Sequence, residues 1–178
     1  MERIHQKTTK IAIMGVLLAL VIVLVIFENM LPPLPGLPPG VRLGLSNVVI
    51  MYTLLALSKK EAGLLLCLKS LFVFLSRGGT AGLFSIAGGL VAVFVMILLL
   101  LVLRQKISYL LLSVAGAIAH NLGQIALAAL MLGTNVIFGY LPILVLSGTI
   151  MGIITGTLLR VSLPLFSNIL TIKVNPRL

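Results

Sequence analysis

Acidic residues are scarce in this 178-residue chain, which has three Asp or Glu side chains against thirteen Lys and Arg. Three carboxylates, Glu2, Glu28 and Glu61, cannot furnish most hydrolytic or prenyl-transfer sites, which rely on acidic groups or on the metals that such groups hold. The sequence also lacks a DDxxD-type acidic pair, a Walker phosphate loop and a nucleophile elbow. We therefore expect a protein that is not an enzyme, binds no cofactor and does not itself hydrolyse ATP.

Cysteine, histidine and aromatic residues are equally sparse. The single cysteine, Cys67, excludes an intramolecular disulfide and a cysteine-based zinc site. Histidine occurs only as His5, in a basic leader, and His120, in an apolar run, so we predict no metal site. Aromatic residues make up 6% of the chain, too few to suggest a base-stacking platform, so the net charge of +10 does not indicate a nucleic-acid partner.

Apolar residues dominate what remains. They make up 60% of the chain, and the mean hydropathy is +1.27, which a water-soluble fold of this length cannot accommodate. A spanning helix needs about 17 to 25 residues. The sequence predicts an all-α integral membrane protein with six transmembrane helices in a single domain over 1–160, followed by a short cytoplasmic or interfacial tail over 161–178. The apolar runs fall at 11–30, 41–58, 62–76, 82–103, 109–132 and 139–160.

The basic residues predict the orientation. If the N-terminus is cytoplasmic, ten of the thirteen cations lie on the inner side, as cytoplasmic loops prefer, and both termini are cytoplasmic. These ten are Arg3, Lys7, Lys10, Lys59, Lys60, Arg104, Lys106, Arg160, Lys173 and Arg177. The first outer loop, Leu31–Gly40, holds five of the eight prolines and is either a lid over a cavity mouth or a spacer in the headgroup region.

A few polar side chains lie at membrane depth, where they are costly unless they face a partner or a wet cavity. We predict that they form a substrate-binding site in the outer half of the membrane: Arg42, Asn47, Lys69, Arg77, His120, Asn121 and Gln124. His120 and Gln124 are four residues apart, so they share one side of a helix with Asn121. The three cations, Arg42, Lys69 and Arg77, would hold an anionic group of the ligand. The three fifth-span residues would contact the polar edge of the same ligand. Alternatively, Glu28 pairs with Lys69 or Arg77, Arg42 reaches the headgroups, and the amides join helices.

Small residues recur at four-residue spacing in two spans. Gly148, Gly152 and Gly156 in the sixth span predict tight packing, more readily within the protein than against a partner. Ala12, Gly15 and Ala19 give the first span a similar strip.

Three motifs resemble a bacterial membrane-protein family known both as Gx transporters and as heptaprenyl diphosphate synthase component I. They are Pro39-Gly40-Val41-Arg42-Leu43-Gly44-Leu45-Ser46-Asn47, Ser85-Ile86-Ala87-Gly88-Gly89 and Ala119-His120-Asn121-Leu122-Gly123-Gln124, and the resemblance spans nearly all of 8–160. The family is similar to the S-components of energy-coupling-factor transporters. These are six-helix proteins that capture a vitamin or metal and dock on a shared ATPase-driven module.

The resemblance implies an S-component-like bundle in the bacterial cytoplasmic membrane that binds a small anionic or amphiphilic molecule, such as a vitamin, flavin or isoprenoid-related compound. It also implies that Ala12, Gly15 and Ala19 dock on a transmembrane coupling protein with its ATPases, although Val16 replaces an alanine expected there. The alternative is a non-catalytic membrane subunit of heptaprenyl diphosphate or quinone synthesis, with a prenyltransferase partner. A third possibility is a role in flavin- and quinone-dependent electron transfer at the cell surface.

Overall fold

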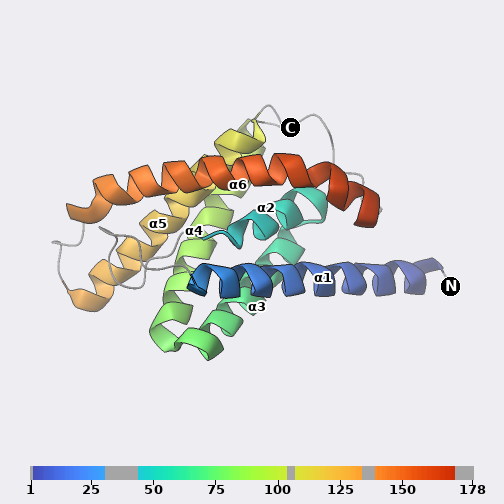
Figure 1. Ribbon diagram of the computed structural model, residues 1–178, viewed down its shortest axis with the longest axis horizontal. Coiled ribbons are helices and arrows are strands. Elements are labelled where there is room, and N and C mark those ends of the chain that lie inside the picture. The colour runs from blue at the N-terminus through green and yellow to red at the C-terminus, as the bar shows by residue number, and fades with distance from the viewer. Residues whose placement is uncertain (1, 31–43, 104–106, 134–138, 171–178) are drawn as a thin grey trace.

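The computed structural model describes the backbone of residues 2–30, 44–103, 107–133 and 139–170, and the side chains of these segments outside 2–7 and 164–170. Every regular element in these segments is a helix, as the sequence predicts. The helices are α1 (Glu2–Met30), α2 (Asn47–Ala56), α3 (Lys59–Arg77), α4 (Gly79–Val102), α5 (Tyr109–Leu132) and α6 (Leu141–Leu170). Successive helices run in alternating directions, and α2 lies between the long helices α1 and α6 (Figure 1).

Four segments are long and apolar enough to cross a membrane: Thr8–Met30, Gly79–Val102, Tyr109–Leu132 and Leu141–Leu163. The predicted count of six crossings is therefore not confirmed. The second predicted span, 41–58, contains only the ten-residue α2 among its described residues, and ten residues rise about 15 Å, half of a bilayer core. The third forms α3, which is nineteen residues long but carries several charges.

Local sequence signals set several helix ends. The Ser58 hydroxyl caps the start of α3: it accepts a hydrogen bond from Lys60 N and donates one to the Glu61 carboxylate. The Ser108 hydroxyl caps α5 by accepting from Leu111 N at 3.2 Å. Gly133 ends α5 in the left-handed conformation, with φ of 62°.

The predicted glycine strip of the sixth span packs inside the protein, against α5. A Cβ added at Gly152 would lie 2.4 Å from Val114 Cα, and one at Gly148 or Gly156 would lie 3.1 Å from an α5 backbone atom. The absence of side chains at these three positions therefore lets the two helix backbones approach closely. The first-span strip behaves differently. Gly15 is exposed, and a Cβ there would meet no atom within 4 Å.

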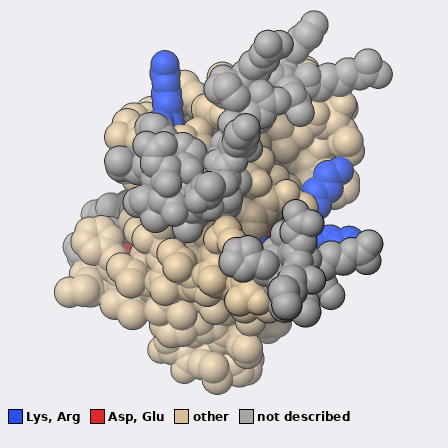
Figure 2. Space-filling model, turned by 90° about the vertical axis from the view of Figure 1, so that its right-hand side faces the viewer, with Lys and Arg blue, Asp and Glu red and all other residues tan. Residues whose placement is uncertain are grey.

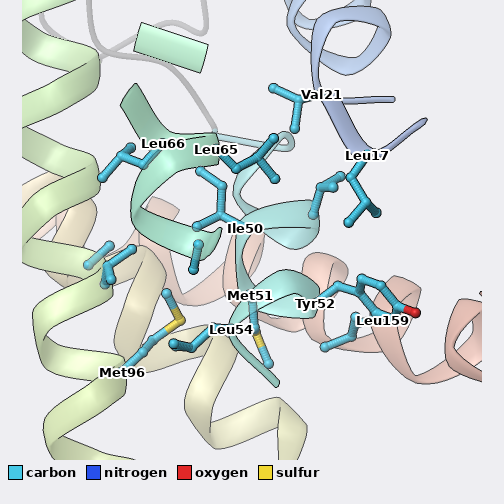
Figure 3. Close-up of a cluster of buried hydrophobic side chains, with 14 of the residues drawn as sticks. Leu17, Val21, Ile50, Met51, Tyr52, Leu54, Leu65, Leu66, Met96 and Leu159 are labelled. Atoms are coloured by element: carbon cyan, nitrogen blue, oxygen red, sulfur yellow. The ribbon is translucent and has the colours of Figure 1, made fainter. Parts of the chain in front are cut away.

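The apolar core centres on α2. Ile50, Met51 and Tyr52 are almost fully buried between α1, α3 and α6, and Figure 3 shows the Tyr52 ring beside Leu159 of α6. Leu17 and Val21 bring the inward face of α1 to the same cluster. The short α2 is thus enclosed by neighbouring helices, where its polar N-terminal end is shielded from lipid.

Exposed cations gather at the end of the molecule where α1 begins. Lys10 of α1 forms an ion pair with Glu61 of α3, so the start of α3 lies beside α1 at a point about 12 Å after the start of α1. Lys59 and Lys60 are exposed next to this pair in the sequence. Figure 2 faces this side of the molecule and shows Lys and Arg side chains projecting from it. Lys10, Lys59 and Lys60 are among the cations that the sequence assigns to the cytoplasm; the orientation itself stays a prediction.

Candidate ligand-binding site

Lys69 is the buried cation of the described structure. It lies ten residues into α3, about 15 Å along the helix axis from its start, and is only 4% exposed. Its ammonium donates a hydrogen bond of 2.6 Å to Asn47 Oδ1. Asn47 is the first residue of α2, so this contact joins the start of one helix to the middle of the next, 22 residues further along the chain. Two of the predicted site residues are thereby in contact.

A tight turn presents Asn47 to Lys69. Residues 44–46 lead into α2, and Asn47 N donates to Gly44 O at 2.9 Å. Gly44 has φ of +76°, and a Cβ at this position would lie 2.6 Å from Asn47 Nδ2 and 3.7 Å from the His120 ring. Only glycine adopts this conformation without strain or collision. Gly44 therefore allows Asn47 and His120 to lie close together at the start of α2.

Glu28 supplies the acidic group of this cluster. It lies in the last turn of α1, is 6% exposed, and its Oε1 accepts a hydrogen bond of 2.5 Å from Gly44 N. The negative charge of Glu28 acts on Lys69. Glu28 thus carries the charge opposite to that of Lys69, and it also fastens the end of α1 to the turn before α2.

His120 and Gln124 complete the cluster from α5. They are one helical turn apart, both are 3% exposed, and Gln124 Nε2 lies 3.2 Å from His120 Nε2, within hydrogen-bonding distance. The positive charge of Lys69 acts on His120, which places the two groups in one electrostatic environment. A Cβ added at Gly88 of α4 would lie 2.8 Å from His120 Nδ1, so glycine is needed there to admit the ring.

Two buried polar atoms in this region have no hydrogen-bond partner among the described residues: Ser46 Oγ and Gln124 Oε1. Buried polar groups are nearly always paired, and an unsatisfied one costs about 1–3 kcal/mol. The two atoms lie in or next to the segments that form the Lys69 cluster. This cluster, defined as Glu28, Gly44, Asn47, Lys69, His120 and Gln124, therefore retains hydrogen-bonding capacity that a ligand or water can use.

Among the other predicted site residues, Asn121 contacts α6. Asn121 Nδ2 donates to Leu144 O at 2.8 Å and so ties α5 to α6. Arg77 is the last residue of α3, eight residues or about 12 Å beyond Lys69 along the helix. Arg42, like the proline loop Leu31–Gly40, falls outside the described residues. The ligand-binding roles assigned to these residues stay predictions.

Sequence reasoning missed two glycines of the site and named Glu28 only as a neutralising partner. Gly44 and Gly88 each lie in a motif that the sequence analysis singled out, yet the reason for the glycine appears only when His120 is placed next to both. Of these three residues, only Glu28 could have been identified from the sequence, since it is the only acidic residue at membrane depth.

The fold and this cluster define a class: an all-α membrane protein with a buried cationic site between its helices. The sequence matches the family described as heptaprenyl diphosphate synthase component I over residues 17–162, and the chain belongs to that family. The match covers all the members of the Lys69 cluster. No curated protein and no solved structure matches the chain.

Proposed function

We propose that this chain captures a small anionic or amphiphilic molecule within the membrane, as the substrate-binding subunit of an uptake transporter of the energy-coupling-factor type. The observation that carries the proposal is Lys69, an ammonium that is 4% exposed in the middle of α3 and hydrogen-bonded to a neutral amide. A buried cation at membrane depth is a functional feature by default, because burying it is costly. An anionic ligand group would meet both a positive charge and the donors around it.

The space at the cluster supports a mechanism in which the ligand exchanges with a side chain. A cavity of about 20 Å³ lies on one side of Asn47, lined by residues of α2, α4, α5 and α6. Such a volume holds about one water molecule and not a phosphate group. An anionic head therefore enters the Lys69 cluster by displacing the Glu28 carboxylate from Gly44 N–H. Glu28 thus occupies, in this structure, the place that we assign to the ligand's charge.

The exposed strip on α1 supports the docking part of the proposal. Ala12, Gly15 and Ala19 are all exposed, and the space over Gly15 is open. Small residues at this spacing let a partner helix approach closely in a membrane. The proposed partner is a transmembrane coupling protein with its ATPases, because the chain has no phosphate-binding loop of its own.

The family description favours a second candidate. A membrane subunit of heptaprenyl diphosphate synthesis would hold a prenyl diphosphate at the same cationic cluster and bind a prenyltransferase at the exposed cations Lys59 and Lys60. In this case too the chain supplies binding and positioning, and the partner enzyme performs the chemistry. The two candidates agree on the chemistry of the ligand and differ in the protein partner.

Mass spectrometry of the proteins and small molecules that co-purify with the tagged chain in mild detergent separates the two candidates. Recovery of a coupling protein with ATPases supports transport, whereas a prenyltransferase without them overturns it and supports the biosynthetic role. A Gly15→Leu variant should lose the coupling protein because it fills the strip. Leu130→Phe adds bulk at an exposed position on α5, outside the strip, and should retain it.

A further inference from the structure

The small cavity on one side of Asn47 brings together polar side chains from three helices. It has a volume of about 20 Å³, which is room for about one water molecule. Asn47 of α2, Ser113 of α5 and Thr155 of α6 all line it. The remainder of the lining consists of glycine and apolar residues, among them Met51 and Met96. The polar side-chain contacts that this cavity offers therefore come from Asn47, Ser113 and Thr155.

Ser113 and Thr155 each present a hydroxyl oxygen that can accept a further hydrogen bond. Both residues are 6% exposed, and their hydroxyl oxygens lie 2.7 Å apart. The Thr155 hydroxyl donates to Met151 O at 2.7 Å, so the Ser113 hydroxyl is the donor in the contact between the two. A hydroxyl has one proton to donate and two lone pairs that accept. Each of the two oxygens therefore keeps acceptor capacity at the cavity wall.

Asn47 turns its amide donors toward the same cavity. Its Oδ1 accepts a hydrogen bond from the Lys69 ammonium, so Nδ2 occupies the other branch of the amide. Nδ2 lies next to Gly44, because a Cβ added at Gly44 would be 2.6 Å from it, and Gly44 also lines the cavity. The cavity thus has N–H donors on α2 and hydroxyl acceptors on α5 and α6.

We propose that this cavity is a binding site for one water molecule, which accepts a hydrogen bond from Asn47 Nδ2 and donates to Ser113 Oγ and Thr155 Oγ1. A buried water typically makes about three hydrogen bonds, which is the number of partners found here. A metal cation does not suit the site, because Asn47 Oδ1 is held by the Lys69 ammonium, whose positive charge would repel it.

The water completes a chain of hydrogen bonds that runs from Lys69 through Asn47 to the Ser113–Thr155 pair. It joins the buried cation on α3 to α5 and α6, two helices that Lys69 does not reach by its own hydrogen bond to Asn47. The chain also fixes the orientation of the Asn47 amide. Because the water donates both of its protons to the hydroxyls, it can only accept from Asn47, which leaves Oδ1 for Lys69. This role does not depend on which ligand the chain captures.

Filling the cavity with a methyl group tests the proposal. The methyl group of Gly116→Ala would take up part of the cavity and lie 3.0 Å from Met96 Sδ. It would expel the water and leave the buried polar groups unpaired, so we expect the Tm of the full chain in detergent to fall by about 2–12 °C. The fall is measured relative to Gly63→Ala, which makes the same backbone change where a Cβ meets no atom within 4 Å.

The same substitution in a chain that also carries Ser113→Ala and Thr155→Val separates loss of water from crowding of Met96. Those two changes remove both acceptors, so Gly116→Ala should then lower the Tm by less than half as much. Equal falls in the two backgrounds show crowding alone and overturn the proposal. An unchanged or raised Tm for Gly116→Ala in the otherwise wild-type chain shows a dry cavity and overturns it as well.

A crystal structure of the wild-type protein gives a readout that needs no variant. We expect solvent density within about 3.2 Å of Asn47 Nδ2 and of both hydroxyl oxygens, and a cavity without such density would rule the water out. If Gly116→Ala does not fold, Ala92→Val fills the same cavity from α4 and replaces it in the thermal-unfolding measurements.

Discussion

Replacement of Lys69 by methionine is the most direct test of the cationic site. Methionine keeps most of the length and volume of the side chain and removes its charge and donors. The substitution takes away the hydrogen bond to Asn47 Oδ1 and the positive charge next to Glu28. An anionic ligand would then lose the positive charge that attracts it.

The expected loss of affinity follows from the single contact removed. A hydrogen bond to a charged group contributes about 1.5–3 kcal/mol, which corresponds to a rise in Kd of about 10- to 150-fold. The free energy of unfolding should change less, because the unsatisfied Asn47 oxygen costs about 1–3 kcal/mol but the cost of burying an ammonium is relieved. The variant should therefore fold and bind poorly.

Calorimetric titration of the detergent-solubilised protein with farnesyl diphosphate measures this loss. Lys60→Met provides the matched control, because Lys60 lies on the same helix and is exposed. The cationic-site hypothesis is wrong if Lys69→Met retains affinity within about twofold of the wild type. A protein that fails to express with Lys69→Met but recovers with an added Glu28→Gln substitution would instead show that Lys69 serves to pair with Glu28.

Three further predictions concern other contacts. Gly152→Ala should lower the free energy of unfolding by about 1–3 kcal/mol, because its Cβ would lie 2.4 Å from the α5 backbone, whereas Gly15→Ala should have no such effect in the same thermal-unfolding assay. Glu28→Gln should tighten diphosphate binding, measured by titration, because it removes the charge that competes with the ligand; weaker binding would contradict that role. The hydrogen bonds from Lys10 and Ser58 lower the pKa of Glu61 to about 2, so the stability they provide is present above about pH 4.5 and lost as the pH falls toward 2. Lys10→Met should weaken that pH dependence, since the Ser58 hydrogen bond remains, and, because Lys10 is exposed, lower stability by at most about 1 kcal/mol, measured by unfolding between pH 2 and 6.

Hydropathy alone located the helices well. The run at 109–132 coincides with α5, and the run at 82–103 differs from α4 by a few residues at its start and one at its end. This success has a physical reason, since a spanning segment must satisfy its backbone internally and stay apolar over its length. The second predicted span, which is not confirmed, has a different explanation. A helix enclosed by other helices can stop halfway through the membrane without any break in the apolar sequence.

Hydropathy gave little information about which side of each helix faces inward. Val93 is 9% exposed and its neighbour Phe94 is 66% exposed, although both are apolar. In a membrane protein the lipid-facing and protein-facing surfaces are both hydrophobic, so no amphipathic period separates them. The spacing of His120 and Gln124 on one helix could be predicted, whereas the contact between Lys69 and Asn47 depends on packing between helices.

The same packing argument bears on the anion site that we propose for a chain with three acidic residues. Burying Lys69 is tolerable only while something compensates its charge, and the described structure provides Asn47 as hydrogen-bond acceptor and Glu28 as the counter-charge. Because Glu28 also holds Gly44, exchange of its carboxylate for a ligand's anionic group would release the end of α1 from the start of α2. The α1 helix carries both the Glu28 contact and the exposed strip around Gly15. In the function that we propose, ligand binding at one end of α1 would therefore be connected through this helix to the surface that we assign to partner docking.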